Sequence, residues 1–244
     1  MNIHSVRTSS SSSAYAPLAE RGDKRAAILR AATNVFAARG FFNAQVADVA
    51  RAAGVAAGTV YLYFRSKDDL LVSIFERTMR EAIEDGRGCV APLSDPIEQL
   101  RAVARVHLDR LGRDRSLAVV FQVELRQSTK FMERFSATLL REYLGIIRGI
   151  VVGGQLAGVF REDVNPTLAA KLIFGGLDEM ATNWILSRRK YSLVGEADAI
   201  VDFFVAGLAS YPNLPRRSGI AAKAGLPRRS GAAAEAGPSV RRKS

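Results

Sequence analysis

The sequence predicts an all-α fold, and three observations support this prediction. Almost every segment between residues 23 and 209 places apolar residues three or four positions apart, which is the spacing of a helix with one buried face. No segment shows the apolar–polar alternation that marks a half-buried strand. Helix breakers and caps, such as Gly40 and the Asn165–Pro166 pair, divide the chain into pieces of helical length.

Four helices are expected in the N-terminal part. The first covers residues 23–39 and ends at Gly40. Two short helices follow over residues 46–53 and 57–64, and a long helix covers about residues 67–85. The apolar stripe of the first helix consists of Ile28, Ala31, Ala32, Val35 and Phe36.

The stretch "GRGCVAPLSDP", residues 86–96, is expected to interrupt the helices because it contains glycine and proline breakers. Ser94 or Asp95 can then cap a helix that begins at Pro96. Later helices are expected over residues 97–111, 115–127, 130–157, 166–189 and 194–209. The pattern describes a small unit of three helices, joined by the fourth helix to a larger helical domain.

Composition excludes several classes of protein. The chain has 244 residues, of which 48% are hydrophobic and 24% charged, as in a globular protein. The single cysteine, Cys89, excludes an internal disulfide framework and fits a reducing cytoplasm. One cysteine and two histidines, His4 and His107, do not predict a metal site. Charge interrupts every long apolar run, so we expect neither a membrane span nor a signal peptide.

The net charge of +11 lies mainly in the C-terminal tail. Residues 212–244 hold eight Arg or Lys residues against one Glu, and they include the tandem repeat "LPRRSGIAAKAG" and "LPRRSGAAAEAG". This tail, like the serine-rich residues 1–22, is predicted to be disordered because it has few apolar residues to bury. It is either a solvated tail or a basic arm that adds non-specific affinity for DNA.

A DNA-contacting unit is predicted from "AGVAAGTVYLYFRSKDDL", residues 53–70. Gly54 allows a sharp turn between two short helices, which is a helix-turn-helix arrangement. At 100° per residue, Val60 and Phe64 point toward the first helix, while Gly58 points outward. A glycine at that place lets the backbone approach a duplex closely.

The neighbouring side chains suit nucleic-acid contact. Thr59 can bond or touch a base edge, and the hydroxyls of Tyr61 and Tyr63 can reach phosphates. Lys67 opens the next helix, whose N-terminal amides also favour a phosphate. The alternative is that the tyrosines belong to the core, which for Tyr61 holds in part.

Residues 28–71, "ILRAATNVFAARGFFNAQVADVARAAGVAAGTVYLYFRSKDDLL", resemble the TetR family of bacterial transcriptional regulators. The resemblance implies that the second short helix enters the major groove from each subunit of a homodimer. Ala44 and Ala56 stand where the family often has Thr and Ser, and a lost cap costs about 1 kcal/mol. The family's DNA-contacting positions correspond here to Gln45, Ala57, Gly58, Thr59, Tyr61, Tyr63 and Lys67.

The larger domain carries two apolar series that suit a pocket, although ordinary core or dimer surface would show the same pattern. The first series comprises Phe121, Leu125, Phe131, Phe135, Leu139 and Tyr143, and the second Phe174, Leu177, Ala181 and Trp184, with Asp178 beside it. Gly175 and Gly176 lie in the middle of a predicted helix, which indicates close approach of another helix or a ligand.

The elements "VELRQS" (123–128), "IFGGLDEMATNW" (173–184) and "RRKYSLV" (188–194) resemble the FadR-type branch of the family, which regulates fatty-acid degradation. The resemblance implies a long-chain acyl-CoA effector and no other cofactor. The acyl pocket would be formed by Phe121, Leu125, Phe131, Phe135, Leu139, Tyr143, Phe174, Leu177, Asp178 and Ala181. The CoA phosphates would meet cations among Arg105, Arg110, Arg113, Arg115, Arg126 and Lys130.

The last two long helices are expected to form the dimer interface because they carry more aromatic surface than one hairpin can bury. The residues concerned are Phe174, Trp184, Phe203, Phe204 and Leu208. The resemblance implies a four-helix interface and a palindromic operator. We therefore expect a DNA-binding domain over residues 23–70 and a ligand-binding and dimerisation domain over residues 71–211.

Two other functions remain open. A repressor of efflux or other genes could bind a different hydrophobic ligand in the same apolar pocket. An enzyme acting on acyl thioesters would need a nucleophile, and neither Cys89 nor His107 lies in a nucleophile motif. The sequence therefore predicts a regulator with no catalytic residues.

Overall fold

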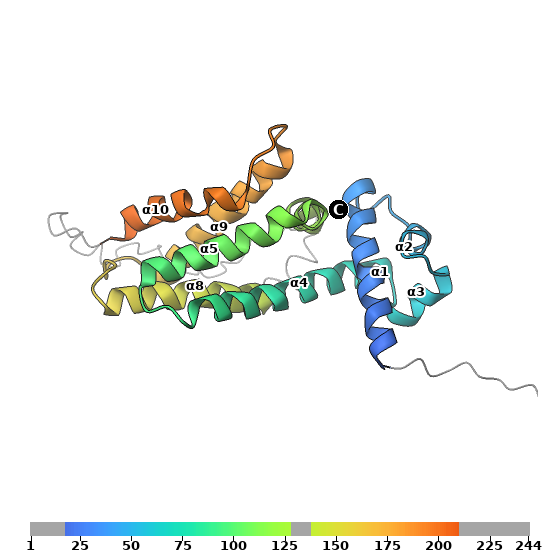
Figure 1. The fold of residues 1–244 in the computed structure, drawn as a ribbon, viewed down its shortest axis with the longest axis horizontal. Coiled ribbons are helices and arrows are strands. Elements are labelled where there is room, and N and C mark those ends of the chain that lie inside the picture. The colour runs from blue at the N-terminus through green and yellow to red at the C-terminus, as the bar shows by residue number, and fades with distance from the viewer. Residues whose placement is uncertain (1–17, 128–137, 210–244) are drawn as a thin grey trace, which may run out of the picture. The chain divides into compact units, whose positions relative to one another are not determined.

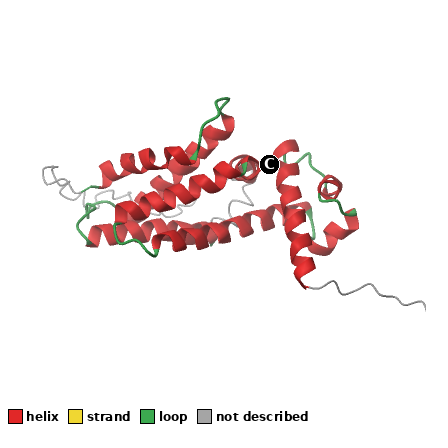
Figure 2. Cartoon of the chain, in the orientation of Figure 1, coloured by secondary structure: helices red, strands yellow, loops and turns green. Residues whose placement is uncertain are grey.

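The protein is described by a computed structural model over residues 18–127 and 138–209, and within these ranges it is built of helices (Figures 1 and 2). The only extended pairing there is an isolated bridge between Phe160 and Ala209. The predicted all-α class is confirmed. Residues 18–22 were predicted to belong to a disordered tail, but they are helical, because the first helix begins at Leu18. The rest of the predicted tails lies outside the described residues.

The described helices follow the predicted order. They are α1 (Leu18–Arg39), α2 (Val46–Ala52), α3 (Ala57–Tyr63), α4 (Lys67–Val90), α5 (Pro96–Arg113), α6 (Arg115–Val119), α8 (Leu139–Leu156), α9 (Pro166–Leu186) and α10 (Ala197–Leu208). Short 3-10 turns are η2 (Leu125–Gln127) and η3 (Val194–Glu196). A π-helical turn, η1 (Val120–Glu124), follows α6.

Two helix boundaries differ from the prediction in an informative way. The helix predicted over residues 115–127 is regular only in α6 and then widens into η1. Helix α4 continues to Val90, through the glycines that were expected to end it. The glycine at position 86 is explained by a tertiary contact, because a Cβ there would lie 3.2 Å from Cδ1 of Ile146 on α8. The glycine permits close helix packing rather than a turn.

The N-terminal helices pack as the sequence predicted. Ile28, Phe36, Val49 and Val60 are completely buried, and Gly54 turns the chain with a φ of +67°. Gly40 ends α1 with a φ of +76°. These residues fix α3 against α1 and α2, so that the opposite side of α3 faces outward.

Helix α5 is central to the larger helical part, because it packs against α4, α8, α9 and α10 (Figure 1). The Asp95 side chain caps it by accepting a hydrogen bond from the Ile97 N–H at 2.9 Å. Helices α8 and α9 pack on one another, and α9 also packs against α10. The interior surrounded by α4, α5, α8 and α9 is where a ligand would be enclosed.

The packing of the α8 C-terminus gives the first testable prediction. A Cβ on Gly154 would overlap the ring of Phe160, which is 1% exposed, whereas a Cβ on Gly153 would meet nothing within 4 Å. We expect Gly154→Ala to lower the free energy of unfolding by about 1–3 kcal/mol through overpacking. Gly153→Ala is the matched control and should raise it by about 0.5–1 kcal/mol. Urea denaturation of both variants measures the difference, and equal effects would contradict the described packing.

Candidate nucleic-acid interface and ligand cavity

Helix α3 exposes the side that the sequence analysis assigned to DNA. Tyr61 is 56% exposed and Leu62 is 82% exposed, and Ala57 and Gly58 are also open to solvent. Thr59 is half-buried. Tyr61 was expected to belong partly to the core, but Tyr63 is the tyrosine that is half-buried and packs against it.

The N-cap of α2 is Gln45, one of the predicted DNA-contacting residues. Ala44 is 2% exposed and belongs to the core, and Gln45 occupies the N-cap position. The Asp48 carboxylate accepts a hydrogen bond from the Gln45 N–H at 3.1 Å. That bond, together with the charges of Arg39 and Arg51, lowers the pKa of Asp48 despite its desolvation. Ala56, at the N-cap of α3, has no side-chain cap, as expected.

Lys67 is held by the turn between α1 and α2. Its ammonium donates to the carbonyl oxygens of Phe41, Phe42 and Ala44 at 2.7, 3.0 and 3.0 Å. The nitrogen also lies 4.6 Å from the centre of the Phe41 ring. An ammonium has three protons, and here three carbonyls accept them. The geometry gives Lys67 a positioning role, and its predicted phosphate contact stays a prediction.

The same turn is held from the other side by Glu124. The buried Glu124 carboxylate, 6% exposed, accepts a hydrogen bond from the Phe41 N–H at 2.7 Å. Glu124 is the last residue of η1. The turn that leads into α2 therefore contacts both α4 and η1, which connects the candidate nucleic-acid interface to the larger helical part.

An enclosed cavity of about 50 Å³ lies inside the larger helical part. It is lined from α4, α5, η1, α8 and α9 by Thr78, Met79, Ala82, Val106, His107, Arg110, Leu111, Phe121, Gln122, Tyr143, Phe174 and Asp178. Of the predicted pocket residues, the structure brings Phe121, Tyr143, Phe174 and Asp178 together here.

The other predicted pocket residues lie elsewhere. Leu125, Leu177 and Ala181 are buried in the core but do not line the cavity. Leu139 lines a separate surface depression beside Arg80 and Arg87. Lys130, Phe131 and Phe135 lie outside the described residues.

One end of the cavity is polar, which the sequence did not predict. His107 Nδ1 lies 3.1 Å from the Tyr143 hydroxyl, and the ring of Phe174 meets the imidazole edge-on at 5.7 Å between ring centres. Burial and then the charge of Arg110 lower the pKa of His107 to about 4, so its imidazole is neutral at physiological pH. Burial also raises the pKa of Tyr143. A single histidine in an amphipathic helix gave no signal for this role.

The carboxylate of Asp178 is already paired on the cavity wall. It accepts a hydrogen bond from Gln122 Nε2 at 2.6 Å and forms an ion pair with Arg126. Gln122 in turn accepts a bond from the Thr182 hydroxyl at 3.1 Å. This network joins η1 to α9.

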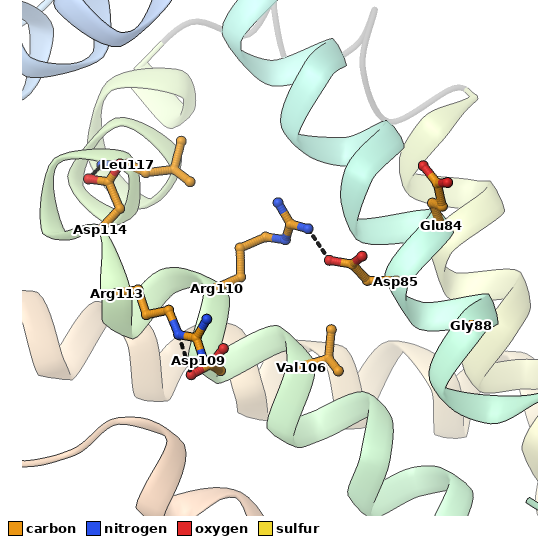
Figure 3. A pocket seen from close by; sticks show the side chains of 9 residues that line it. All are labelled: Glu84, Asp85, Gly88, Val106, Asp109, Arg110, Arg113, Asp114 and Leu117. Carbon is orange, nitrogen blue, oxygen red and sulfur yellow. Dashed lines mark hydrogen bonds and ion pairs between the residues drawn. The ribbon is translucent and has the colours of Figure 1, made fainter.

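A surface groove of about 740 Å³ lies between α4 and α5 beside the cavity (Figure 3). Val106 and Arg110 line both the groove and the cavity, so they form part of the wall between them. Arg110 pairs with Glu81 at 2.9 Å and with Asp85. The charged lining consists of Glu84, Asp85, Asp109 and Asp114 against Arg110 and Arg113.

The other predicted phosphate-binding arginines are dispersed and occupied. Arg113 pairs with Asp109 at 2.9 Å at the end of α5 (Figure 3). Arg115 donates to backbone carbonyls at the end of α9 and lies 5.1 Å from the ring centre of Trp184. Arg105 forms a two-bond pair with Asp198 at 2.9 and 2.7 Å. The loop "GRDRS" therefore does not form one cluster of free cations.

Of the predicted dimer residues, some side chains are exposed and others are buried. Phe203 is 77% exposed, whereas Leu208 is 6% exposed and Phe174 faces the cavity. Phe204 packs on Gly176, where a Cβ would lie 2.8 Å from its ring. Trp184 donates its indole N–H to the Tyr191 carbonyl at 3.1 Å. Further exposed apolar side chains on α9 are Leu168, Leu172 and Leu186.

Comparison with known proteins assigns both parts of the chain to models of regulatory proteins. Residues 28–74 match the model described as bacterial regulatory proteins, tetR family, and residues 75–207 match the model of the YsiA-like protein C-terminal region. The fatty acid metabolism regulator protein of Bacillus subtilis (strain 168) is 36% identical over 181 residues, which cover 74% of this chain and 93% of that protein.

Two solved structures share the fold and a similar identity. The crystal structure of FadR from Bacillus subtilis in complex with stearoyl-CoA has a TM-score of 0.71 and 36% identity, covering 75% of this chain and 98% of that one. The fatty acid degradation regulator FadR from Bacillus halodurans has a TM-score of 0.71 and 35% identity, with the same coverage.

The buried imidazole predicts a pH dependence of stability. Because the folded-state pKa of His107 is about 4 and the unfolded value is 6.5, the unfolded state binds more protons between these values. Stability from His107 is therefore present above pH 6.5 and is lost as the pH falls toward 4. We expect the free energy of unfolding to fall by about 1–2 kcal/mol from pH 7 to pH 5. Denaturant titrations should show a smaller fall in His107→Gln, and an equal fall in both proteins would contradict this.

Proposed function

The chain belongs to the TetR family of bacterial regulators, and from that premise we propose that it is a transcriptional repressor released from its operator by a long-chain acyl-CoA. Residues 23–70 would bind DNA, and residues 71–211 would bind the effector and form the homodimer. Since operators lie on the chromosome, we place the protein in the cytoplasm. The preferred targets are genes of fatty-acid degradation, because the Bacillus subtilis relative is a fatty acid metabolism regulator.

The observation that carries the proposal is the double role of η1. Phe121 and Gln122 of this turn line the inner cavity, and Glu124 of the same turn bonds to the Phe41 N–H beside α2. A ligand that changes the cavity wall must therefore act on a segment that also holds the DNA-binding unit. The similarity to a FadR structure with bound stearoyl-CoA supports an acyl-CoA as that ligand.

For the DNA half of the proposal, α3 is the recognition helix. Gly58 brings the backbone close to base edges, while Thr59 and Tyr61 supply polar contacts from its exposed side. Gln45 and Ala57 lie at the exposed starts of α2 and α3, and Tyr63 would contribute only through its accessible part. We assign Lys67 to holding this unit rather than to phosphate binding.

For the dimer, the exposed apolar residues of α9 and α10 are the proposed interface. Leu168 and Leu172 are 54% and 57% exposed, and Phe203 is 77% exposed, which is unusual for large apolar side chains outside an interface. A two-fold pairing of these helices would present two α3 helices to successive major grooves, about 34–36 Å apart on a palindromic operator.

The size of the cavity defines the conformational step. The enclosed space of about 50 Å³ is far smaller than ligand sites in general, which measure about 300–1,000 Å³. Acyl-CoA would therefore select a wider state of the bundle. It can shift the equilibrium only by the difference between its affinities for the two states. Widening displaces η1 or α4, and both support the turn before α2.

A second candidate is a TetR-type repressor that responds to a different hydrophobic ligand. The groove beside the cavity favours this alternative, because four of its lining residues are acidic and its two arginines are paired. CoA phosphates would have to displace those carboxylates, whereas an uncharged or cationic amphipath would not. An enzymatic function has little support, because burial raises the pKa of the Cys89 thiol and so disfavours the reactive thiolate.

The proposed function predicts release of DNA by acyl-CoA. We expect palmitoyl-CoA to dissociate the purified protein from a palindromic duplex of its own promoter region in a gel-shift titration. Free CoA at the same concentration is the control and should have no effect, because only the acyl chain enters the cavity. Release by hydrophobic drugs but not by palmitoyl-CoA would select the second candidate, and failure to bind the duplex would refute a repressor at this site.

The position of Lys67 predicts how its loss affects binding. Lys67→Met should lower the free energy of unfolding by about 1–3 kcal/mol, because three carbonyls lose a charged donor. Operator affinity should fall, but the slope of log affinity against log salt should stay unchanged. Loss of a phosphate contact would instead reduce that slope by about 0.9. Arg77→Met, which removes an exposed charge on the same helix, is the control and should change neither quantity.

A further inference from the structure

The polar end of the cavity contains two atoms that lack hydrogen-bond partners. Among the described residues, Nε2 of His107 and Nε of Arg110 are buried without a partner. Both residues line the cavity and lie three positions apart on α5, on the same face of the helix. Buried polar atoms normally have hydrogen-bond partners, so two such atoms in residues of one cavity point to a place that can bind a polar group of a ligand.

Both atoms can be assigned as donors. The Tyr143 hydroxyl lies 3.1 Å from His107 Nδ1. We assign the Tyr143 O–H as the donor and His107 Nδ1 as the acceptor of this bond. A neutral imidazole that accepts at Nδ1 carries its proton on Nε2, and we assign this tautomer from the bonding pattern. The Nε–H of an arginine is always a donor. The terminal nitrogens of Arg110 are held by Glu81 and Asp85, which fixes the guanidinium in place.

Two donors from neighbouring turns of α5, both in residues that line the cavity, favour a ligand group that only accepts. A carbonyl oxygen has two lone pairs and no proton, so it can satisfy both N–H groups. A carboxylate would fit less well, because Glu81 and Asp85 already balance the charge of Arg110 and an added negative charge would be buried without compensation. The chemistry therefore favours an uncharged ester or thioester over a free fatty acid.

The position of His107 and Arg110 matches the position that the thioester of the proposed ligand would take. Val106 and Arg110 line the surface groove (Figure 3), and they also line the cavity together with Phe121 and Phe174. A ligand with its polar part in the groove and its chain in the cavity would pass this wall at the junction between the two parts. In an acyl-CoA that junction is the thioester.

We propose that His107 and Arg110 form a carbonyl-binding subsite that recognises the thioester oxygen of the effector. This inference rests on the proposed function, because it states which group of an acyl-CoA His107 and Arg110 would bind. The two donors would distinguish acyl thioesters from other amphipaths of equal length. Tyr143 is a positioning residue in this subsite, since it acts by fixing the tautomer of His107.

The test compares two ligands on the full-length wild-type protein. One is palmitoyl-CoA, and the other is S-hexadecyl-CoA, a thioether in which a CH₂ group replaces the carbonyl. We expect titration calorimetry to give about tenfold tighter binding of the thioester, from two hydrogen bonds made only by the carbonyl. The chain length, the nucleotide and the net charge are the same in both ligands, so the carbonyl alone accounts for the difference.

Variants locate the effect. His107→Phe keeps an aromatic ring beside Phe174 but removes the donor, and it should reduce the preference for the thioester to about threefold or less. Gly153→Ala, which lies on α8 outside the cavity and has room for a Cβ, is the control and should keep the full preference. A thermal unfolding profile of each variant checks that it is folded, and the wild-type comparison needs no variant.

The outcomes separate this inference from the proposed function. If both ligands bind equally and both release the operator, the subsite is refuted and the repressor proposal stands. An unchanged preference in His107→Phe also refutes the subsite. If the wild-type protein binds neither ligand, the acyl-CoA proposal itself fails and the subsite fails with it.

Discussion

The turn between α1 and α2 is held by two charged side chains, and the position of the recognition helix depends on them. The Lys67 ammonium donates hydrogen bonds to three carbonyl oxygens of the turn, and the Glu124 carboxylate accepts one from the Phe41 N–H. Charge-assisted bonds of this kind are about twice as strong as neutral ones. Because one partner belongs to α4 and the other to η1, the larger helical part restrains the DNA-binding helices at two points.

These two restraints provide a physical route by which the ligand cavity can affect the DNA-binding helices. A ligand effect could pass along α4 alone, as a rigid helix between the two parts. The structure adds a second connection, since η1 carries Phe121 to the cavity and Glu124 to the turn within four positions. Single π-helical turns are rare and are frequently found at functional sites, so η1 is a suitable element to adopt two arrangements.

Local patterns allowed much of the fold to be predicted, and contacts distant in sequence account for what was missed. The burial of Val60 and the cap at Asp95 follow from spacing and residue type within a few positions. The continuation of α4 through Gly86 depends on α8, and the role of Lys67 depends on carbonyls more than twenty positions away. No local pattern encodes such partners. Arg105, Arg110 and Arg126 showed the same limit, because their acidic partners lie on other helices.

Because the cavity is small and the arginines beside it are paired, a long ligand can bind only if its binding energy separates the helices around the cavity. Burying an acyl chain contributes about 0.8 kcal/mol per CH₂, so a chain of about sixteen carbons offers on the order of 10 kcal/mol before the opening is subtracted. Moving from a nearly closed to a nearly open population takes about 5.5 kcal/mol of differential binding. A long chain exceeds that requirement, whereas a short chain does not. Under the proposed function, the small cavity would act as a length filter, because only a long apolar chain would offset the cost of separating the helices that hold η1 in place.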